Sequence, residues 1–325
     1  MPNAYQDVLS RARNGIARPG ADPTYADGDD STWLSVDWQS ISRDVFIDGR
    51  SVHFVDSGGD KPPLLFIHGL GGVWQNWLLN LPAFMDEHRV VAFDLPGFGQ
   101  SDVAPEESIP AFARTADRLC AMLGLDRPVV IGNSMGGFVG AELALSFPTR
   151  VEKLVLISAA GLSTEFVARE PVLAAARAAA GLLAVFGGQA DNVVRRKRLR
   201  RAFLQSVVRY PERLSVPLTT ELVRGGPSAG FNESFRALLN YSFRDRLSRI
   251  DIPVLIVWGR NDILLPVEDA QMFEHLIGEN AHAVIFDDTG HLPMLERPSR
   301  FNQLVAGFIA GERAPEAGVP GASRL

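Results

Sequence analysis

Short runs of consecutive apolar residues recur along the chain, with helix-like stretches between several of them. A run that is apolar at every position is typical of a strand buried on both faces of a parallel sheet. The helix-like stretches carry apolar residues at helical spacing, and one of them places Cys120 on its apolar stripe. This alternation predicts a doubly wound α/β sheet. Its expected strands are 64–67, 90–93, 129–131, 154–157, 254–258 and 283–286.

Two segments depart from the alternation. Short apolar segments at 45–47 and 52–55 flank Asp48-Gly49, a strong hairpin signal, and they predict that the sheet begins with an antiparallel pair. Between 160 and 249 the strand pattern stops, and the residues are helix-like and rich in Ala, Leu and Arg. We expect an all-helical insertion between two strands of one sheet, of the kind that often forms a lid over a site.

These patterns predict an N-terminal extension followed by one core that a cap interrupts. The extension is expected to be irregular, with a short helix near 5–13, and Trp33, Leu34 and Trp38 are expected to attach its end to the core. The last residues are typical of a disordered tail. The expected organisation is an extension at 1–43, a core at 44–159 and 250–310, a helical cap at 160–249 and a tail at 311–325.

Composition narrows the class of protein. The 325 residues are 46% hydrophobic and 22% charged, which excludes disorder for most of the chain. The one cysteine, Cys120, excludes an internal disulfide framework, and one cysteine with six histidines excludes a Cys/His zinc cluster. A net charge of −6 argues against nucleic-acid binding.

No targeting or membrane segment is evident. Residues 1–30 lack the apolar stretch of a signal peptide, so we expect a cytoplasmic location. The most apolar stretch, 172–186, is too short to span a membrane and carries Arg177 in its middle. We therefore expect a buried or cap helix there, and no stable membrane association.

The chemistry is indicated first by residues 132–136, which read Gly-Asn-Ser-Met-Gly. This G-x-S-x-G pattern comes directly after an expected strand and before a helical pattern at 138–147, the context of a nucleophile elbow. Gly132 and Gly136 would avoid side-chain clashes beside the strained turn that carries Ser134. The alternative is a turn whose small residues serve packing only.

A serine nucleophile needs a base, and His291 is the candidate among the histidines. It follows the last expected strand, at the sheet edge where catalytic groups of open α/β folds collect. His68 directly precedes Gly69 and is expected to shape that loop, while His282 begins a strand and is expected to be structural. The remaining histidines, at positions without such a context, are His53, His88 and His275.

The third group is an acid that orients the imidazole and stabilises it when protonated. Asp262 follows a buried strand and gives the chain order nucleophile, acid, base that accompanies this type of elbow. Asp287 and Asp288 are rivals, but from the same strand end as His291 they would have difficulty reaching the far side of its ring. Asp94 also lies at a strand end, but it precedes the serine.

Two backbone N–H groups, those of Leu70 and Met135, are the expected donors of an oxyanion hole. Leu70 lies in the glycine-rich run 68–72 after an expected strand. Met135 follows Ser134 at the start of a helix, whose N-terminal dipole favours negative charge. The alternative for the glycine run is a flexible turn.

Together these segments resemble the α/β-hydrolase superfamily across about residues 44–310. The resemblance implies an α/β-hydrolase fold with a helical cap between two core strands, and a structural rather than catalytic role for the loop that begins at Asp94. The matching pieces are HGLGG at 68–72, DLPGFGQSD at 94–102, GNSMGG at 132–137, WGRND at 258–262 and GH at 290–291.

The expected activity is hydrolysis of a carboxylic ester with an apolar group, through an acyl-enzyme on Ser134 and with no metal or organic cofactor. The expected partner is this small molecule, not a nucleic acid. One alternative is cleavage of C–C bonds in ring-fission products, although such hydrolases commonly have Trp directly after the catalytic histidine, where this chain has Leu292. Another is a low-turnover ligand receptor on the same scaffold.

A basic block in the expected cap has two interpretations. It is either a clamp for an anionic substrate or phospholipid surface, or a solvated helix face. The second interpretation, with Val194, Leu199 and Phe203 turned inward, is favoured. The block consists of Arg195, Arg196, Lys197, Arg198, Arg200 and Arg201.

Overall fold

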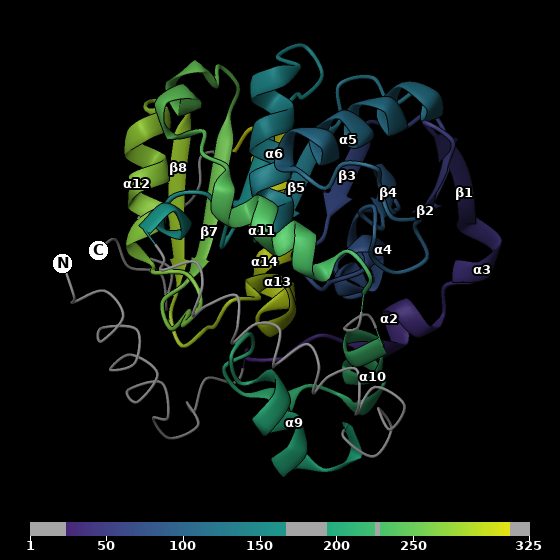
Figure 1. Cartoon of the computed structure of the whole chain (residues 1–325). Helices are drawn as coiled ribbons and strands as arrows, with labels where there is room; N and C mark the ends of the chain where they lie inside the picture. The colour runs from purple at the N-terminus through teal and green to yellow at the C-terminus, as the bar shows by residue number, and fades with distance from the viewer. Residues whose placement is uncertain (1–23, 167–193, 225–227, 313–325) are drawn as a thin grey trace.

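A mixed sheet of eight strands occupies the centre of the molecule (Figure 1). The computed structural model describes residues 24–166, 194–224 and 228–312. Each apolar run of the sequence forms one of its strands, which confirms the predicted α/β class. These strands are β3 (Pro63–Ile67), β4 (Arg89–Phe93), β5 (Val129–Asn133), β6 (Leu154–Ile157), β7 (Val254–Gly259) and β8 (Ala281–Phe286).

The sheet begins with the predicted hairpin at one edge. β1 (Ser42–Ile47) pairs antiparallel with β2 (Arg50–Asp56), and the two residues between them, Asp48 and Gly49, have φ of 53° and 75° as a tight hairpin turn requires. β2 pairs antiparallel with β4, and the remaining neighbours pair in parallel. The strand order is β1-β2-β4-β3-β5-β6-β7-β8.

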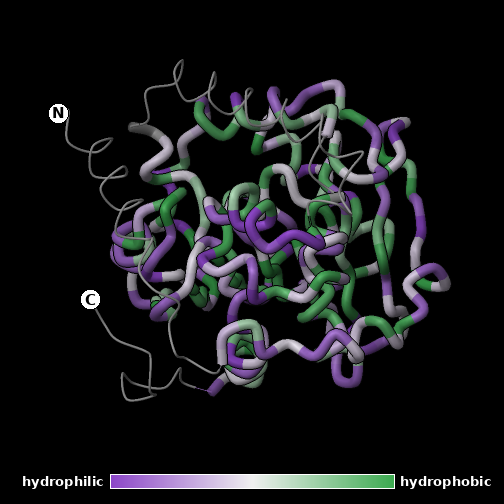
Figure 2. The backbone as a smooth tube through the Cα atoms, turned by 90° about the horizontal axis from the view of Figure 1, so that it is seen from below, coloured by the Kyte–Doolittle hydropathy of each residue, from purple (hydrophilic) through white to green (hydrophobic). Residues whose placement is uncertain are grey.

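Helices cover both faces of this sheet (Figure 1). Alternate residues of each strand point to opposite faces, so Leu65 and Ile67 of β3 join one buried cluster while Leu64 and Phe66 join the other. The hydrophobic stretches of the chain accordingly concentrate inside the molecule (Figure 2). The first cluster is covered by α5 (Ile109–Leu123), α6 (Met135–Ser146) and α12 (Glu268–Ile277), the second by α4 (Leu81–Phe84), α13 (Pro293–Glu296) and α14 (Pro298–Ala310).

Helix α5 carries the predicted apolar stripe. Ser108 caps its N-terminus by accepting from the Ala111 N–H, and Gly124 ends it in the left-handed conformation. Cys120 is fully buried on the stripe, and this burial raises the pKa of its thiol to about 12. A thiol that stays protonated is a poor nucleophile, so Cys120 is the core residue that the pattern predicted.

The segment between β6 and β7 (160–249), here called the β6–β7 insertion, consists of short helices joined by turns and loops and contains no strand among its described residues. The stretch 172–186 lies outside the described residues. Within the basic block, Arg200 departs from the expectation of a solvated face, because it is buried and donates to the Leu214 carbonyl at 2.7 Å. The insertion contains η2 (Ser163–Phe166), α9 (Lys197–Leu204), η3 (Pro211–Arg213), α10 (Val216–Arg224), α11 (Phe231–Asn240) and η4 (Arg244–Arg249).

Two short helices, α2 (Asp30–Leu34) and α3 (Trp38–Ile41), lead into the sheet. Trp33 is buried as expected, and Trp38 packs on Trp74 with ring centroids 5.2 Å apart. The expectation for Leu34 is wrong. Leu34 is 58% exposed, because Trp33 takes the inward position of this one-turn helix. The expected helix at 5–13 and most of the expected tail lie outside the described residues.

Among the described residues, no helix combines the length and the apolar character needed to cross a membrane. In the same part of the chain, no group of three or more His, Cys, Asp or Glu side chains is arranged to hold a metal ion.

Candidate active site

Ser134 lies on the sharp turn between β5 and α6, with φ of 55° and ψ of −118°. A positive φ is strained for a residue with a side chain, and the turn is held by hydrogen bonds on both sides. The Ser134 N–H donates to the Ile157 carbonyl at 2.8 Å, and the Ala160 N–H donates to the Ser134 carbonyl at 3.1 Å. These bonds fix Ser134 at the C-terminal edge of β5 and β6.

The two glycines of the motif are required by close backbone approach, as the sequence predicted. A Cβ at Gly136 would overlap the carbonyl oxygen of Ile67 at the end of β3. A Cβ at Gly132 would overlap the backbone of Gly136 itself. Side chains at either position would therefore push the start of α6 away from the sheet.

Asp262 and His291 meet across the ends of β7 and β8. His291 Nδ1 lies 2.7 Å from Asp262 Oδ2, and both residues are buried. The other carboxylate oxygen, Oδ1, accepts from the N–H groups of Leu264 at 2.9 Å and Leu265 at 3.1 Å. Because an ionised carboxylate only accepts, the proton lies on Nδ1, and Nε2 is left as the acceptor that a base needs.

The rival carboxylates are engaged elsewhere. Asp287 pairs with Arg260, and Asp288 accepts from Arg209 Nε at 2.5 Å and from the Tyr210 hydroxyl at 2.8 Å. These contacts hold the backbone of the loop that precedes His291.

Asp94 also has a structural role, the one implied by the family resemblance. Its carboxylate accepts from the N–H groups of Trp74 at 2.8 Å and Gln100 at 2.9 Å. Asp94 therefore ties the loop that it begins to η1 (Trp74–Trp77), which follows the glycine-rich run.

The glycine-rich run 68–72 lies directly against the Ser134 turn. A Cβ at Gly69 would be 3.1 Å from Ser134 Cβ and 3.2 Å from the Asn133 carbonyl oxygen. The turn is closed by a 3.0 Å hydrogen bond from the Gly72 N–H to the Gly69 carbonyl. Leu70 and Met135, the expected oxyanion donors, therefore belong to two segments that adjoin beside Ser134.

His68 holds this loop in place and is not available as a base. Its Nδ1–H donates to the Gly69 carbonyl at 2.8 Å, and its Nε2 accepts from the Leu95 N–H at 2.9 Å. Burial lowers the pKa of His68, against a smaller opposing effect of Asp94. The predicted structural role of His68 is confirmed.

Three residues of the matching sequence pieces to which the sequence assigned no role, Asn133, Gly259 and Gly290, help to assemble the site. Asn133 Nδ2 donates to the carbonyls of Ile157 at 3.1 Å and His291 at 3.4 Å, which links the serine turn to the histidine loop. A Cβ at Gly259 would overlap the Gly290 carbonyl oxygen. Gly259 and Gly290 let the backbones after β7 and β8 touch. The available signal was a glycine shortly before each candidate residue, three positions before Asp262 and directly before His291.

The β6–β7 insertion contacts the loops on both sides of the site. The Gly230 N–H donates to the Gly97 carbonyl at 2.9 Å, and the Phe231 ring comes within 3.3 Å of where a Cβ at Gly71 would lie. On the opposite side, the Val207 carbonyl accepts from the His291 N–H at 3.1 Å. The insertion therefore lies over the sheet edge that carries the candidate residues.

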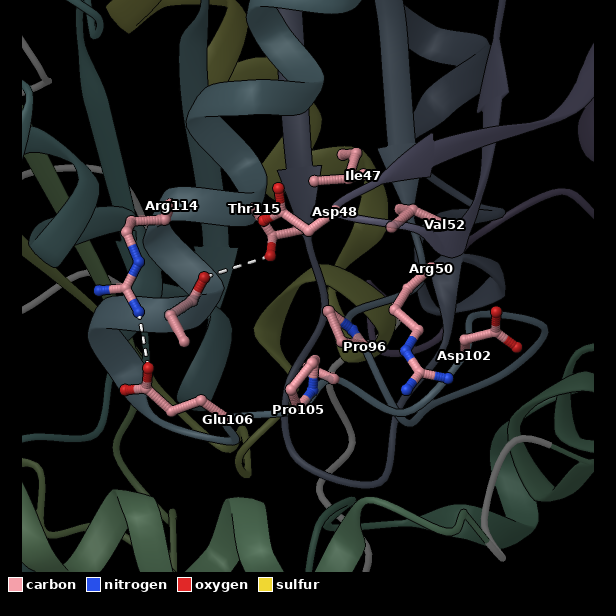
Figure 3. A pocket seen from close by; sticks show the side chains of 12 residues that line it. Ile47, Asp48, Arg50, Val52, Pro96, Asp102, Pro105, Glu106, Arg114 and Thr115 are labelled. Carbon is pink, nitrogen blue, oxygen red and sulfur yellow. Dashed lines mark hydrogen bonds and ion pairs between the residues drawn. The ribbon is translucent and has the colours of Figure 1, made fainter.

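A surface pocket elsewhere on the molecule lies between the β1–β2 hairpin, the loop after β4 and the first turns of α5 (Figure 3). Charged side chains of both signs line it, including the ion pair of Arg114 with Glu106 at 2.9 Å. None of the candidate catalytic or oxyanion residues is among its lining residues. This pocket is therefore separate from the candidate site.

Comparison with known proteins identifies the family. The model of the family described as the alpha/beta hydrolase fold matches residues 62–298. The chain belongs to the α/β-hydrolase family. This α/β hydrolase is 30% identical over 282 residues to the dihydrolipoyllysine-residue acetyltransferase component of an acetoin cleaving system from Cupriavidus necator, across 82% of this chain and 68% of that protein.

Two further proteins are similar to this chain. The chain is 30% identical over 269 residues to a 2-hydroxy-6-oxononadienedioate/2-hydroxy-6-oxononatrienedioate hydrolase from Paraburkholderia phymatum, across 79% of this chain and 90% of that protein. The solved structure of Est816, described as an N-acyl homoserine lactone degrading enzyme, is 28% identical, with a TM-score of 0.63 over 82% of this chain and all of that one. The family relationship implies hydrolysis of a small molecule.

Proposed function

We propose that this α/β hydrolase is a serine hydrolase that cleaves a carboxylic ester through an acyl-enzyme. Ser134 is the nucleophile, His291 the base and Asp262 the group that orients the base. The observation that carries the proposal is the 2.7 Å contact between buried His291 Nδ1 and Asp262 Oδ2. It leaves Nε2 as a proton acceptor at the sheet edge where the Ser134 turn lies.

The steps of the reaction follow from these positions. His291 Nε2 takes the proton of the Ser134 hydroxyl while Oγ attacks the ester carbonyl carbon. The N–H groups of Leu70 and Met135 stabilise the oxyanion, and loss of one such donor typically raises the barrier by about 3 kcal/mol. The protonated His291 then gives its proton to the leaving alcohol, and in the second half it activates the water that releases the acid.

The β6–β7 insertion is proposed to act as a cap over an apolar part of the substrate. Phe231 of α11 lies against the glycine-rich run and stacks on Phe235, with ring centroids 6.2 Å apart. Leu70 is half-buried on the same side, packed against the first core cluster. Apolar side chains above an oxyanion loop favour an ester with an apolar acyl or alcohol group.

Activity on a series of p-nitrophenyl esters from acetate to palmitate tests the proposal. The chain is expected to turn over at least one ester catalytically, and Ser134→Ala is expected to lose that turnover while remaining folded. The chain-length optimum would measure the space beneath the insertion. Turnover that persists in Ser134→Ala, or no turnover of any ester, would contradict the proposed activity.

Cleavage of a C–C bond is a second candidate, favoured by the 30% identity to the Paraburkholderia phymatum hydrolase over 90% of that protein. Against it, the residue after His291 is Leu292, which is buried in the second core cluster. A vinylogous 1,5-diketone acid, the kind of compound formed by ring fission, distinguishes the two. Faster turnover of this compound than of every ester would favour the second candidate. Stoichiometric modification without turnover would instead favour a receptor.

A further inference from the structure

The carboxylate of Glu296 is fully buried beneath the loop that carries His291. Glu296 is the last residue of the one-turn helix α13, which follows that loop directly. Its Oε1 accepts from the N–H groups of Gly290 at 3.0 Å and Leu292 at 3.2 Å. The backbone on both sides of His291 is therefore bound to one carboxylate.

The remaining N–H of this loop is bound from a different direction. The His291 N–H donates to the Val207 carbonyl in the β6–β7 insertion at 3.1 Å. Glu296 reaches the same segment, since its Oε2 accepts from the Arg209 N–H at 2.9 Å. The consecutive N–H groups of 290, 291 and 292 thus all have acceptors. The insertion takes part in two hydrogen bonds here, one that Val207 accepts from His291 and one that Arg209 donates to Glu296.

A third segment completes the surroundings of the carboxylate. The Tyr25 hydroxyl, from the region before the sheet, donates to Glu296 Oε2 at 2.7 Å and accepts from the Tyr210 N–H at 2.9 Å. A Cβ at Gly290 would lie 2.9 Å from Glu296 Oε1 and 3.0 Å from the Arg209 nitrogen. Glycine at 290 is what allows this close approach.

In the described part of the chain, the groups bonded to the Glu296 carboxylate are all donors. Gly290, Leu292 and Arg209 present backbone N–H groups, which cannot become acceptors, and only the Tyr25 hydroxyl can reverse its role. Burial raises the pKa of Glu296, and the hydrogen bonds from Tyr25 and the backbone act against that rise. A glutamine would place its NH2 group against N–H donors, so the site requires a carboxylate.

We propose that Glu296 is a positioning residue: it fixes residues 290–292 so that the His291 imidazole stays aligned with Asp262 and Ser134, and it ties that alignment to the β6–β7 insertion. The inference rests on the proposed function, because it acts through His291. A displacement of about 1 Å at a catalytic group can lower a rate by about 10²-fold. Glu296→Gln should therefore lower reactivity by roughly this factor while changing ground-state binding little.

The test uses two readouts that a purely structural role would not move. The first is the rate at which diisopropyl fluorophosphate inactivates the full-length chain, a probe of Ser134 reactivity that needs no known substrate. The second is the downfield proton resonance of His291 Nδ1–H, assigned by its loss in His291→Gln. Both are measured at a temperature where circular dichroism shows each variant to be folded.

Asp269→Asn is the matched control. Asp269 on α12 is a buried carboxylate that accepts from the Ser163 N–H at 3.1 Å. This bond joins α12 to η2 and not to the His291 loop. Glu296→Gln is expected to slow inactivation about 10²-fold and to shift or broaden the His291 resonance, while Asp269→Asn leaves both as in the wild type. A folded Glu296→Gln that keeps the wild-type rate and resonance would overturn the proposal.

A milder variant covers the case in which Glu296→Gln does not fold. Tyr25→Phe removes one donor to Oε2 without touching the loop, so inactivation is expected to slow several-fold and the resonance to shift. Unchanged values in folded Tyr25→Phe would then count against the inference. If the wild type is not modified at Ser134, the proposed function fails, and the resonance alone still decides whether Glu296 positions His291.

Discussion

The carboxylate of Asp262 has both of its oxygens engaged, which makes the effect of an amide replacement predictable at the residue scale. Oδ1 accepts from two backbone N–H groups, so an asparagine would keep its oxygen there and turn its NH2 toward His291 Nδ1. The imidazole would then carry its proton on Nε2, where it cannot accept from Ser134. Asp262→Asn is expected to lower kcat by roughly 10⁴-fold with little change in stability, measured by ester hydrolysis and urea unfolding. A loss below tenfold would show that Asp262 does not set the tautomer.

Gly259 supports a second residue-scale prediction, because the Gly290 carbonyl oxygen occupies the position of its missing Cβ. Gly259→Ala is expected to lower the free energy of unfolding by about 3 kcal/mol, the upper range for overpacking. Gly58→Ala is the control: Gly58 has φ of 69° but open space around it, so its cost is limited to about 1–2 kcal/mol of backbone strain. Equal costs in urea unfolding would show that the two loops can separate without penalty.

The sequence identified the candidate residues that follow strand ends and some of the residues that support them, such as His68, but not Glu296. Ser134, Asp262 and His291 stand in short local motifs, and the structure brings the last two into contact. Glu296 could not be predicted in the same way. Its partners include Tyr25, 271 positions away, and Arg209 in the insertion, so no local pattern records the contact.

At the scale of elements, Glu142 fixes the end of the β6–β7 insertion to helix α6. This buried carboxylate accepts from the Tyr241 hydroxyl and from Arg246 Nη2, each at 2.7 Å. Arg246→Ala leaves a buried charge without its main partner and is expected to cost about 3 kcal/mol, the lower end for a broken buried pair. Arg236→Ala breaks an exposed pair with Glu233 at 3.5 Å and is expected to cost under about 1 kcal/mol. Urea midpoints that do not differ between Arg246→Ala and Arg236→Ala would argue against this role of Glu142.

The elements themselves were largely predictable, and the exceptions have physical reasons. Runs that are apolar at every position became parallel strands, since such residues are covered on both faces. The pattern could not show that β5 extends to Asn133, because that extension depends on pairing with Ile157 of β6. Nor could it show that Arg200 in a basic run is buried, which depends on the Leu214 carbonyl.

The stability of the whole molecule is expected to fall in mild acid because of His68. The folded state holds this buried ring neutral, and its pKa is lowered, whereas the unfolded chain binds a proton near pH 6.5. As the pH falls below that value the unfolded state takes up the proton first, so stability present at neutral pH is lost. The free energy of unfolding should fall between pH 7 and 5 more steeply in the wild type than in His68→Gln, by up to about 1.4 kcal/mol per pH unit. Parallel slopes would show that His68 is not responsible.

The central claim is that Ser134 forms an acyl-enzyme, and trapping that intermediate tests it most directly. The full-length chain is mixed with an excess of the p-nitrophenyl ester that it turns over fastest, quenched in acid, digested and analysed by peptide mass spectrometry. The account predicts the acyl group on Ser134, accumulation of this adduct in His291→Ala only at a strongly reduced rate, and no adduct in Ser134→Ala. An acyl group on another residue would contradict it. So would hydrolysis that forms no adduct and continues at the wild-type rate in Ser134→Ala.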